Sequence, residues 1–277
     1  MRKKITFLIH LFVGISFCSV NVLCNDKVNV GIVTPGNYKD EGGCIFDNRT
    51  TVQMGEEFAN LSCNLYGDTN LLFHYKNANA WEIDLKSGQN NTNLNVDDVD
   101  LAIFCGHGLA KGYDKFGNYY PHNSLHFYTN NSNKVFHKKE NESGANLDVI
   151  EANWGSGASK TKWVVVYACN FLNSTDGCYK SVLNGVHQVL GFSTKMYITK
   201  ECSGVFAFYL SHGFSIRDSF FWSAIEEMGP NMNEKCIATV LTAKQSVEDT
   251  IFNYSSKPSP WGRGGTYYQY DAVIRYK

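Results

Sequence analysis

The sequence has no basic stripe, no internal repeat, no low-complexity run and no linker that would divide it. Its 25 lysines and arginines stand against 26 aspartates and glutamates, so it lacks the clustered positive charge of a nucleic-acid-binding protein. Beyond its first segment it also has no apolar run long enough to cross a bilayer. We therefore expect neither a nucleic-acid partner nor a membrane-spanning segment in the body of the chain.

The first segment has the pattern of a secretory signal peptide. Met1–Lys4 is basic, Ile5–Val20 is almost wholly apolar, and Val22–Cys24 offers acceptable residues before a cleavage site. The pattern predicts a signal peptide over residues 1–24 and a secreted or extracytoplasmic mature chain. A membrane anchor is the alternative, but the apolar run is shorter than the ~20 residues that a spanning helix needs.

The rest of the chain, residues 25–277, suits a single domain. A chain of this size buries a core without needing cross-links, and an aromatic content of 14% favours a packed globule over disorder. Cleavage would remove Arg2, Lys3 and Lys4 and no acidic residue, which takes the net charge from −1 to −4. We expect no stable membrane insertion after cleavage, and the oligomeric state is open.

Seven cysteines would remain in the mature chain, at positions 44, 63, 105, 169, 178, 202 and 236. In an oxidising compartment most of them are expected to pair in disulfide bonds. Because seven is odd, at least one thiol is left over, and a leftover thiol is a candidate reactive group. The connectivity stays open.

Seven N-x-S/T triplets indicate a possible glycoprotein. They begin at Asn48, Asn60, Asn90, Asn130, Asn141, Asn173 and Asn253. A composition rich in asparagine forms such triplets by chance, and the sequence does not decide between the two explanations.

The hydrophobic pattern predicts strands that alternate with helices. The expected strands are Val28–Val33, Leu71–Tyr75, Trp81–Leu85, Val99–Cys105, Trp163–Ala168, Gln188–Phe192 and Thr266–Tyr276, and the expected helices cover 54–65, 176–183, 205–210 and 215–228. Cys236–Leu241 fits either a helix or a strand. This alternation favours an α/β fold, a three-layer αβα sandwich whose sheet is mostly parallel.

The polar segment Leu109–Asn153 is predicted to be a long excursion above the sheet. Within it, Leu125–Tyr128 and Val135–His137 are expected to pair as a hairpin. The excursion also carries His122, His126 and His137, which are expected to be solvated.

Two residues with reactive side chains follow buried strands. His107 comes just after Val99–Cys105, and Cys169 comes just after Trp163–Ala168. Ligand sites in open parallel sheets lie beyond the carboxyl ends of the strands, so the two side chains meet if these strands are neighbours. A thiol beside an imidazole forms a nucleophile with its proton acceptor. Gly108 would let a substrate approach the backbone and offer an N–H to an oxyanion.

These residues also lie in two recognisable motifs. Leu101–Gly108 (LAIFCGHG) has four apolar residues that lead to His-Gly, and Val164–Cys169 (VVVYAC) is an apolar strand that ends in Ala-Cys. The pair resembles the signatures of the caspase-like (clan CD) cysteine peptidases, which include caspases, legumains, gingipains and separases. Further segments, up to Met228, resemble the later part of bacterial caspase-like domains, and the chain looks most like an uncharacterised family of them.

The resemblance implies a caspase-like sheet and a set of roles for the site. His107 and Cys169 would form the catalytic dyad, and backbone N–H groups of Gly108 and Cys169 would hold the oxyanion. The implied protein is a secreted cysteine peptidase-like hydrolase that cleaves peptide or protein substrates with no metal and no cofactor.

The sequence also departs from the family. Cys169 is followed by Asn170 and Phe171 in place of the Arg-Gly of true caspases, so their pocket for aspartate is not implied. Other hypotheses also stay open: a catalytically inactive binding module, a Cys169 held in a disulfide, or a zinc ion bound by Cys105, His107 and Cys169.

Overall fold

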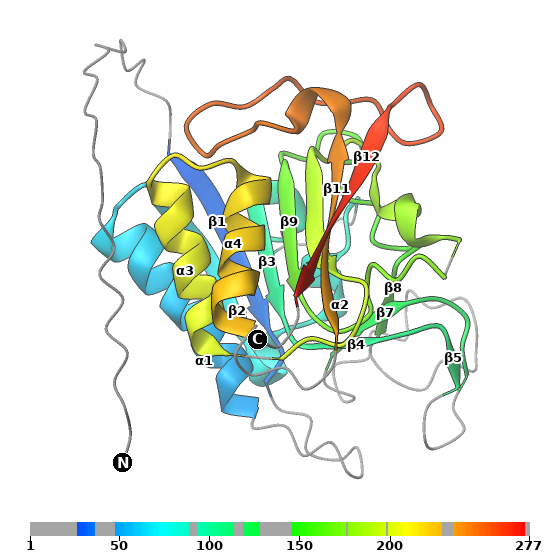
Figure 1. Ribbon diagram of the computed structural model, residues 1–277, viewed down its shortest axis with the longest axis horizontal. Coiled ribbons are helices and arrows are strands. Elements are labelled where there is room, and N and C mark those ends of the chain that lie inside the picture. The colour runs from blue at the N-terminus through cyan, green and yellow to red at the C-terminus, as the bar shows by residue number, and fades with distance from the viewer. Residues whose placement is uncertain are drawn as a thin grey trace.

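The computed structural model describes residues 27–36, 48–88, 93–113, 119–127, 146–175, 177–197, 199–228 and 235–274. Among these residues, seven strands form one mixed and mostly parallel sheet, in the order β12-β11-β10-β9-β3-β1-β2 (Figure 1). The strands are β1 (Val28–Thr34), β2 (Thr69–Lys76), β3 (Leu101–Cys105), β9 (Trp163–Tyr167), β10 (Gln188–Phe192), β11 (Cys236–Ala243) and β12 (Tyr267–Ile274). The chain therefore has the expected α/β class.

The centre of the sheet is formed by β3 and β9, which are parallel neighbours, as predicted. Their register pairs Leu101 with Trp163 and Cys105 with Tyr167. Every residue of both strands is buried, which explains why they are continuously apolar: each strand packs on both of its faces. The carboxyl ends of β3 and β9 consequently lie side by side.

The segment whose type the sequence left open, Cys236–Leu241, belongs to strand β11. It pairs antiparallel with β10, and β12 pairs antiparallel with β11 at the edge of the sheet. Because β11 runs in the opposite direction, its first residue, Cys236, lies at the same edge of the sheet as the last residues of β9 and β10.

Three longer helices pack together over one face of the sheet (Figure 1). They are α1 (Asn48–Ala59), which continues as a π-helical segment (Asn60–Leu65), α3 (Lys200–Ser211) and α4 (Ile216–Met228). Ser215 caps α4, because its Oγ accepts the N–H of Asp218 at 3.1 Å. An apolar cluster between these helices and the sheet includes Phe58, Phe206 and Phe220.

The opposite face carries a second apolar cluster, which is covered by irregular segments and short helices. One of them is α2 (Glu82–Leu85), and the predicted strand Trp81–Leu85 is therefore wrong. The alternation of apolar and acidic residues suggested a strand, but Asp84 accepts the N–H of Trp81 at 2.8 Å and closes a helical turn. The indole of Trp154 then donates to the carbonyl of Leu85 at 2.7 Å.

The excursion after β3 builds two small sheets of its own. Strands β4 (His107–Leu109), β7 (Ser124–His126) and β8 (Asn146–Asp148) form an antiparallel three-stranded sheet, and β5 (Gly112–Tyr113) pairs with β6 (Tyr119–Tyr120). Part of the predicted hairpin, Leu125–His126, is thus a strand, but its described partners are β4 and β8. Val135–His137 lies outside the described residues.

The predicted signal peptide, residues 1–24, also lies outside the described residues. Within the ranges that the structure does describe, no helix is both long and apolar enough to cross a membrane.

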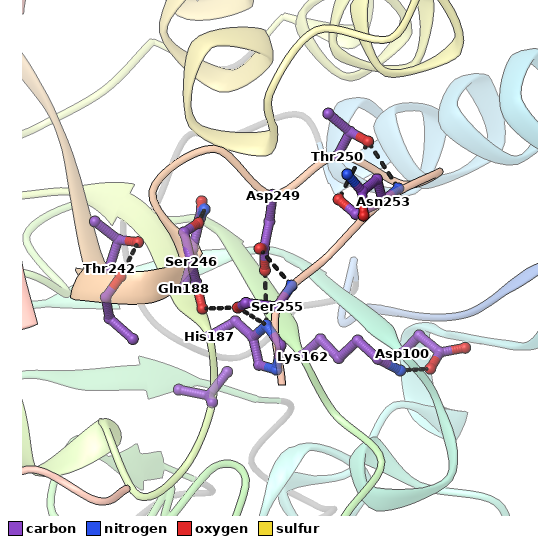
Figure 2. A network of polar contacts seen from close by, with 12 residues as sticks. Asp100, Lys162, His187, Gln188, Thr242, Ser246, Asp249, Thr250, Asn253 and Ser255 are labelled. Carbon is purple, nitrogen blue, oxygen red and sulfur yellow. Dashed lines mark hydrogen bonds and ion pairs between the residues drawn. The ribbon is translucent and has the colours of Figure 1, made fainter. Parts of the chain in front are cut away.

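A buried polar network lies at the amino ends of the central strands. Figure 2 shows His187, which precedes β10, with its Nδ1 2.6 Å from Oδ2 of Asp249. Both side chains are only 3% exposed. Oδ1 of Asp249 accepts the N–H of Ser255 at 2.9 Å. The backbone carbonyl of Asp249 accepts the N–H of Ile216, the first residue of α4, at 2.8 Å. Asp249 therefore joins the segment after β11 to both β10 and α4.

Asp249→Ala is expected to destabilise the fold by about 3 kcal/mol, because it leaves the ring of His187 and the N–H of Ser255 buried without their acceptor. Urea unfolding would measure this as a lower midpoint with an unchanged slope. Glu248→Ala is the matched control, since that neighbouring side chain is 78% exposed and should change stability by less than about 0.5 kcal/mol. Equal midpoints for the two variants would contradict the prediction.

Candidate functional site

The site lies beyond the carboxyl ends of β3 and β9. The last paired residues of these strands are Cys105 and Tyr167, and the N–H of Gly106 still bonds the carbonyl of Tyr167 at 3.1 Å. His107 and Cys169 each come two residues after that last pair. The sheet register thus delivers both residues to the same edge, from strands that hydrogen-bond each other.

The two segments approach closely at Gly108. A Cβ atom built on this glycine would lie 2.0 Å from the carbonyl oxygen of Cys169 and 3.1 Å from Cβ of Ala168. Only a residue without a side chain permits this contact, because the nearest atom is a backbone oxygen that no side-chain rotation can move away. The His107-Gly108 segment therefore packs directly on the backbone of Cys169.

The thiol of Cys169 is partly buried and has a backbone donor beside it. The N–H of Met196 points at Sγ from 3.4 Å, and the carbonyl of Met196 lies 3.8 Å from Sγ. Burial raises the pKa of the Cys169 thiol, while the Met196 N–H and the positive charge of Lys195 oppose that rise. Burial therefore works against ionisation of this thiol, and a neighbouring base would help to generate the thiolate nucleophile.

The backbone after Cys169 is held in an uncommon conformation. Asn170 has a positive φ of 59°, in the left-handed region that asparagine tolerates better than most residues. Its N–H donates to the carbonyl of Thr194 at 2.9 Å, and the N–H of Leu172 donates to the carbonyl of Phe192 at 3.1 Å. These bonds fix the turn after Cys169 on the end of β10. Positive φ in a non-glycine residue is found where the surroundings over-determine the chain, as at active sites.

His107, the other residue of the site, belongs to the three-stranded sheet, where it pairs with His126 on β7. The ring of His126 is in turn 2.5 Å from Oδ1 of Asn146, its partner on β8. His126 is 4% exposed, so the expectation that it is solvated is wrong. His122 is half-buried, with its Nδ1 3.5 Å from a carboxylate oxygen of Asp148, and His137 lies outside the described residues.

Most of the cysteines were expected to pair, and several of them do not. Free thiols are carried by Cys63, Cys105, Cys169, Cys202 and Cys236, whereas Cys44 lies outside the described residues. Cys169 and Cys236 both lie near Thr194, whose carbonyl accepts the N–H of Asn170 and whose hydroxyl accepts the N–H of Ile237, and both remain free thiols.

The buried thiols belong to the core. Cys105, Cys202 and Cys236 lie in the apolar cluster beneath the three helices, and Cys169 packs against its edge. Burial raises the pKa of Cys202 and of Cys236 to about 12 and that of Cys105 further, which keeps these three neutral and unreactive. Cys169, by contrast, is partly exposed.

The described residues contain no cluster of three or more His, Cys, Asp or Glu side chains able to hold a metal ion. Among them, the alternative of zinc held by Cys105, His107 and Cys169 therefore has no structural support. Cys105 is also fully buried within β3, away from any open coordination position.

Sequence reasoning found the two strand ends but missed Met196 and the surroundings of His126. Met196 contributes its backbone, which any residue type would supply. The only available signal was its position, four residues after the predicted strand Gln188–Phe192 and so at the same edge as Cys169.

Comparison with known proteins adds one finding. A family model described as "Domain of unknown function (DUF6345)" matches residues 50–268. That range includes the whole site, from β3 through the segment after β10. No curated protein matches the chain.

Proposed function

The chain belongs to this family of domains of unknown function (DUF6345), and we propose that it is a cysteine peptidase whose nucleophile is Cys169. The observation that carries the proposal is the contact of Gly108 with the carbonyl of Cys169, which holds the His107-Gly108 segment against the nucleophile. A thiol, an imidazole and backbone N–H groups at one strand edge are the components that acyl transfer requires.

Each step of the proposed reaction has a residue for it. His107 takes the proton of the Cys169 thiol, and the sulfur attacks the carbonyl carbon of the scissile peptide bond. Backbone N–H groups of Gly108 and Cys169 stabilise the oxyanion that forms. His107 then gives its proton to the leaving amine, and a thioester is left on Cys169. Water hydrolyses the thioester with His107 as base, which releases the acid and restores the thiol.

The raised pKa of Cys169 supports this order of events. A thiol that rests as a thiolate would attack without help, whereas a protonated thiol needs the imidazole at the moment of attack. The proposal is therefore general-base activation, and not a standing thiolate–imidazolium pair.

We also propose that the fold is the three-layer, caspase-like sandwich that the motifs imply. Three helices cover one face of a mostly parallel sheet, short helical segments cover the other, and His-Gly and Ala-Cys follow neighbouring parallel strands. The signal-like start of the chain and its N-x-S/T triplets support a secreted glycoprotein that acts on peptides or proteins. The inactive binding module remains the alternative outcome.

Selective alkylation of Cys169 is expected to stop peptide hydrolysis in step with the modification. The protein would be treated with iodoacetamide at several pH values, mapped by mass spectrometry, and assayed on a peptide library. Because burial raises the pKa of Cys169, its thiolate fraction is at most a few per cent at pH 7 and rises as the pH rises. The alkylation rate should accordingly climb between pH 7 and 9 without a plateau.

The matched control is Cys63, another partly exposed free thiol, which lies in the helical segment after α1. Its modification should leave hydrolysis unchanged. Hydrolysis that survives complete alkylation of Cys169 contradicts the proposal, and an absence of hydrolysis in the untreated protein favours the binding module.

A further inference from the structure

A buried asparagine connects the two halves of the candidate site. Asn123 immediately precedes β7 and is fully buried, which is uncommon for this residue type. Its Oδ1 accepts the N–H of Lys111 at 2.9 Å. Its Nδ2 donates to the carbonyl of Asn173 at 2.9 Å and to the carbonyl of Phe171 at 3.3 Å.

These partners belong to the segments that carry the proposed dyad. Lys111 comes two residues after β4, the strand of His107 and Gly108, and Phe171 comes two residues after Cys169. The backbone carbonyl of Asn123 also accepts the N–H of Val149, just after β8, at 2.9 Å. One residue therefore ties the three-stranded sheet to the turn that follows the nucleophile.

The chemistry of this position calls for a carboxamide. Two carbonyl oxygens need donors and one N–H needs an acceptor, and the asparagine side chain supplies two N–H groups and one oxygen from a short, planar group. A carboxylate would place negative charge against two carbonyls, and an apolar residue would leave three backbone groups without these partners.

We propose that Asn123 is a positioning residue for the proposed peptidase: its amide sets the position of the His107-Gly108 segment relative to Cys169. The inference rests on the proposed function, and it adds a residue that does not touch the reacting atoms. Gly108 packs on the Cys169 carbonyl, and Asn123 hydrogen-bonds the turn that follows Cys169. Small misplacements at a reacting centre are costly, about 10²-fold in rate for roughly 1 Å.

The experiment compares Asn123→Asp with Asp249→Ala, which loses stability at the opposite edge of the sheet and leaves the candidate site untouched. With both variants folded at the assay temperature, Asn123→Asp should lower kcat about 10²-fold and change KM by less than about threefold. Relative to the wild type at the same pH, the kcat of Asn123→Asp should be reduced less at low pH than at neutral pH, because a protonated carboxyl group regains one O–H donor for the carbonyls. Asp249→Ala should keep kcat within about twofold and keep the wild-type pH profile.

A second measurement needs no peptidase activity. The titration of the His107 ring, followed by NMR, should shift when Cys169 is replaced by alanine, because the proposal places the ring next to the thiol. In the Asn123→Asp background, the same replacement should produce at most half of that shift. This measurement separates the two proposals. If the wild-type protein hydrolyses nothing but Asn123→Asp still reduces the coupling between His107 and Cys169, then Asn123 is a positioning residue and the peptidase proposal fails.

Two results would overturn the inference. One is a folded Asn123→Asp protein with wild-type kcat and wild-type coupling between His107 and Cys169. The other is a wild-type protein without any coupling, because Asn123 would then have no pair to position. If Asn123→Asp does not fold, Asn123→Ser keeps one donor and one acceptor in a smaller volume, and the same criteria apply to it.

Discussion

Cys169→Ala and His107→Ala are each expected to reduce kcat for peptide hydrolysis by about four to six orders of magnitude. The first removes the attacking sulfur, and the second removes the only group proposed to take the proton from a thiol whose pKa burial raises. Because the two side chains act as one unit, the double variant should be little worse than either single one. Rates measured on a peptide library, with the thermal unfolding of each variant, test this.

The control for the loss of a partly exposed thiol is Cys63→Ala, which should retain the wild-type rate. All of these variants should unfold cooperatively near the wild-type temperature, since neither His107 nor Cys169 is fully buried. The proposed mechanism is falsified if either dyad variant hydrolyses the library at the wild-type rate.

Gly108→Ala is expected to damage both stability and activity. The new methyl group would lie 2.0 Å from the carbonyl oxygen of Cys169, where carbon and oxygen need more than 3 Å, and no side-chain rotation relieves the contact. Backbone must move on one side or the other, at a cost of about 3 kcal/mol in stability. Displacement of the proposed oxyanion donor should add a loss of about 10²-fold or more in kcat.

Gly177→Ala is the matched control, because a Cβ atom there meets nothing within 4 Å. It should alter the free energy of unfolding by less than about 0.5 kcal/mol and leave the rate unchanged. A Gly108→Ala protein as stable and as active as Gly177→Ala would show that the two backbone segments do not pack as described.

The centre of the sheet could be predicted because its signal is local and strong. Strands β3 and β9 are apolar throughout, as strands packed on both faces must be, and the residues after them lie at the carboxyl edge by the geometry of parallel strands. For the same reason, the neighbouring positions of the His107 and Cys169 segments followed from the sequence. Strand β11 stayed ambiguous because periodicity does not separate a short buried strand from a short buried helix.

What sequence reasoning missed depends on contacts between distant segments. Asn123 hydrogen-bonds residues that come before and after it in the sequence, up to 50 positions away. No pattern in the adjacent sequence indicates that it is buried. His126 is buried because its strand, β7, lies between β4 and β8. Strand β8 is only three residues long, which is too short for a sequence pattern to indicate. Cysteine pairing was inferred from the expected compartment, but the positions of the thiols in the fold decide it, and Cys169 and Cys236 remain free.

The pairing of Cys105 with Tyr167 has a consequence for the time course of folding. The two residues are 62 positions apart in the sequence, and bringing them together costs loop-closure entropy. Non-local pairing of this kind slows folding, and the segments of His107 and Cys169 come together only when β3 and β9 have paired. A nascent or partly folded chain would therefore carry the thiol and the imidazole on separate segments, and the proposed reactivity would arise only with the completed fold.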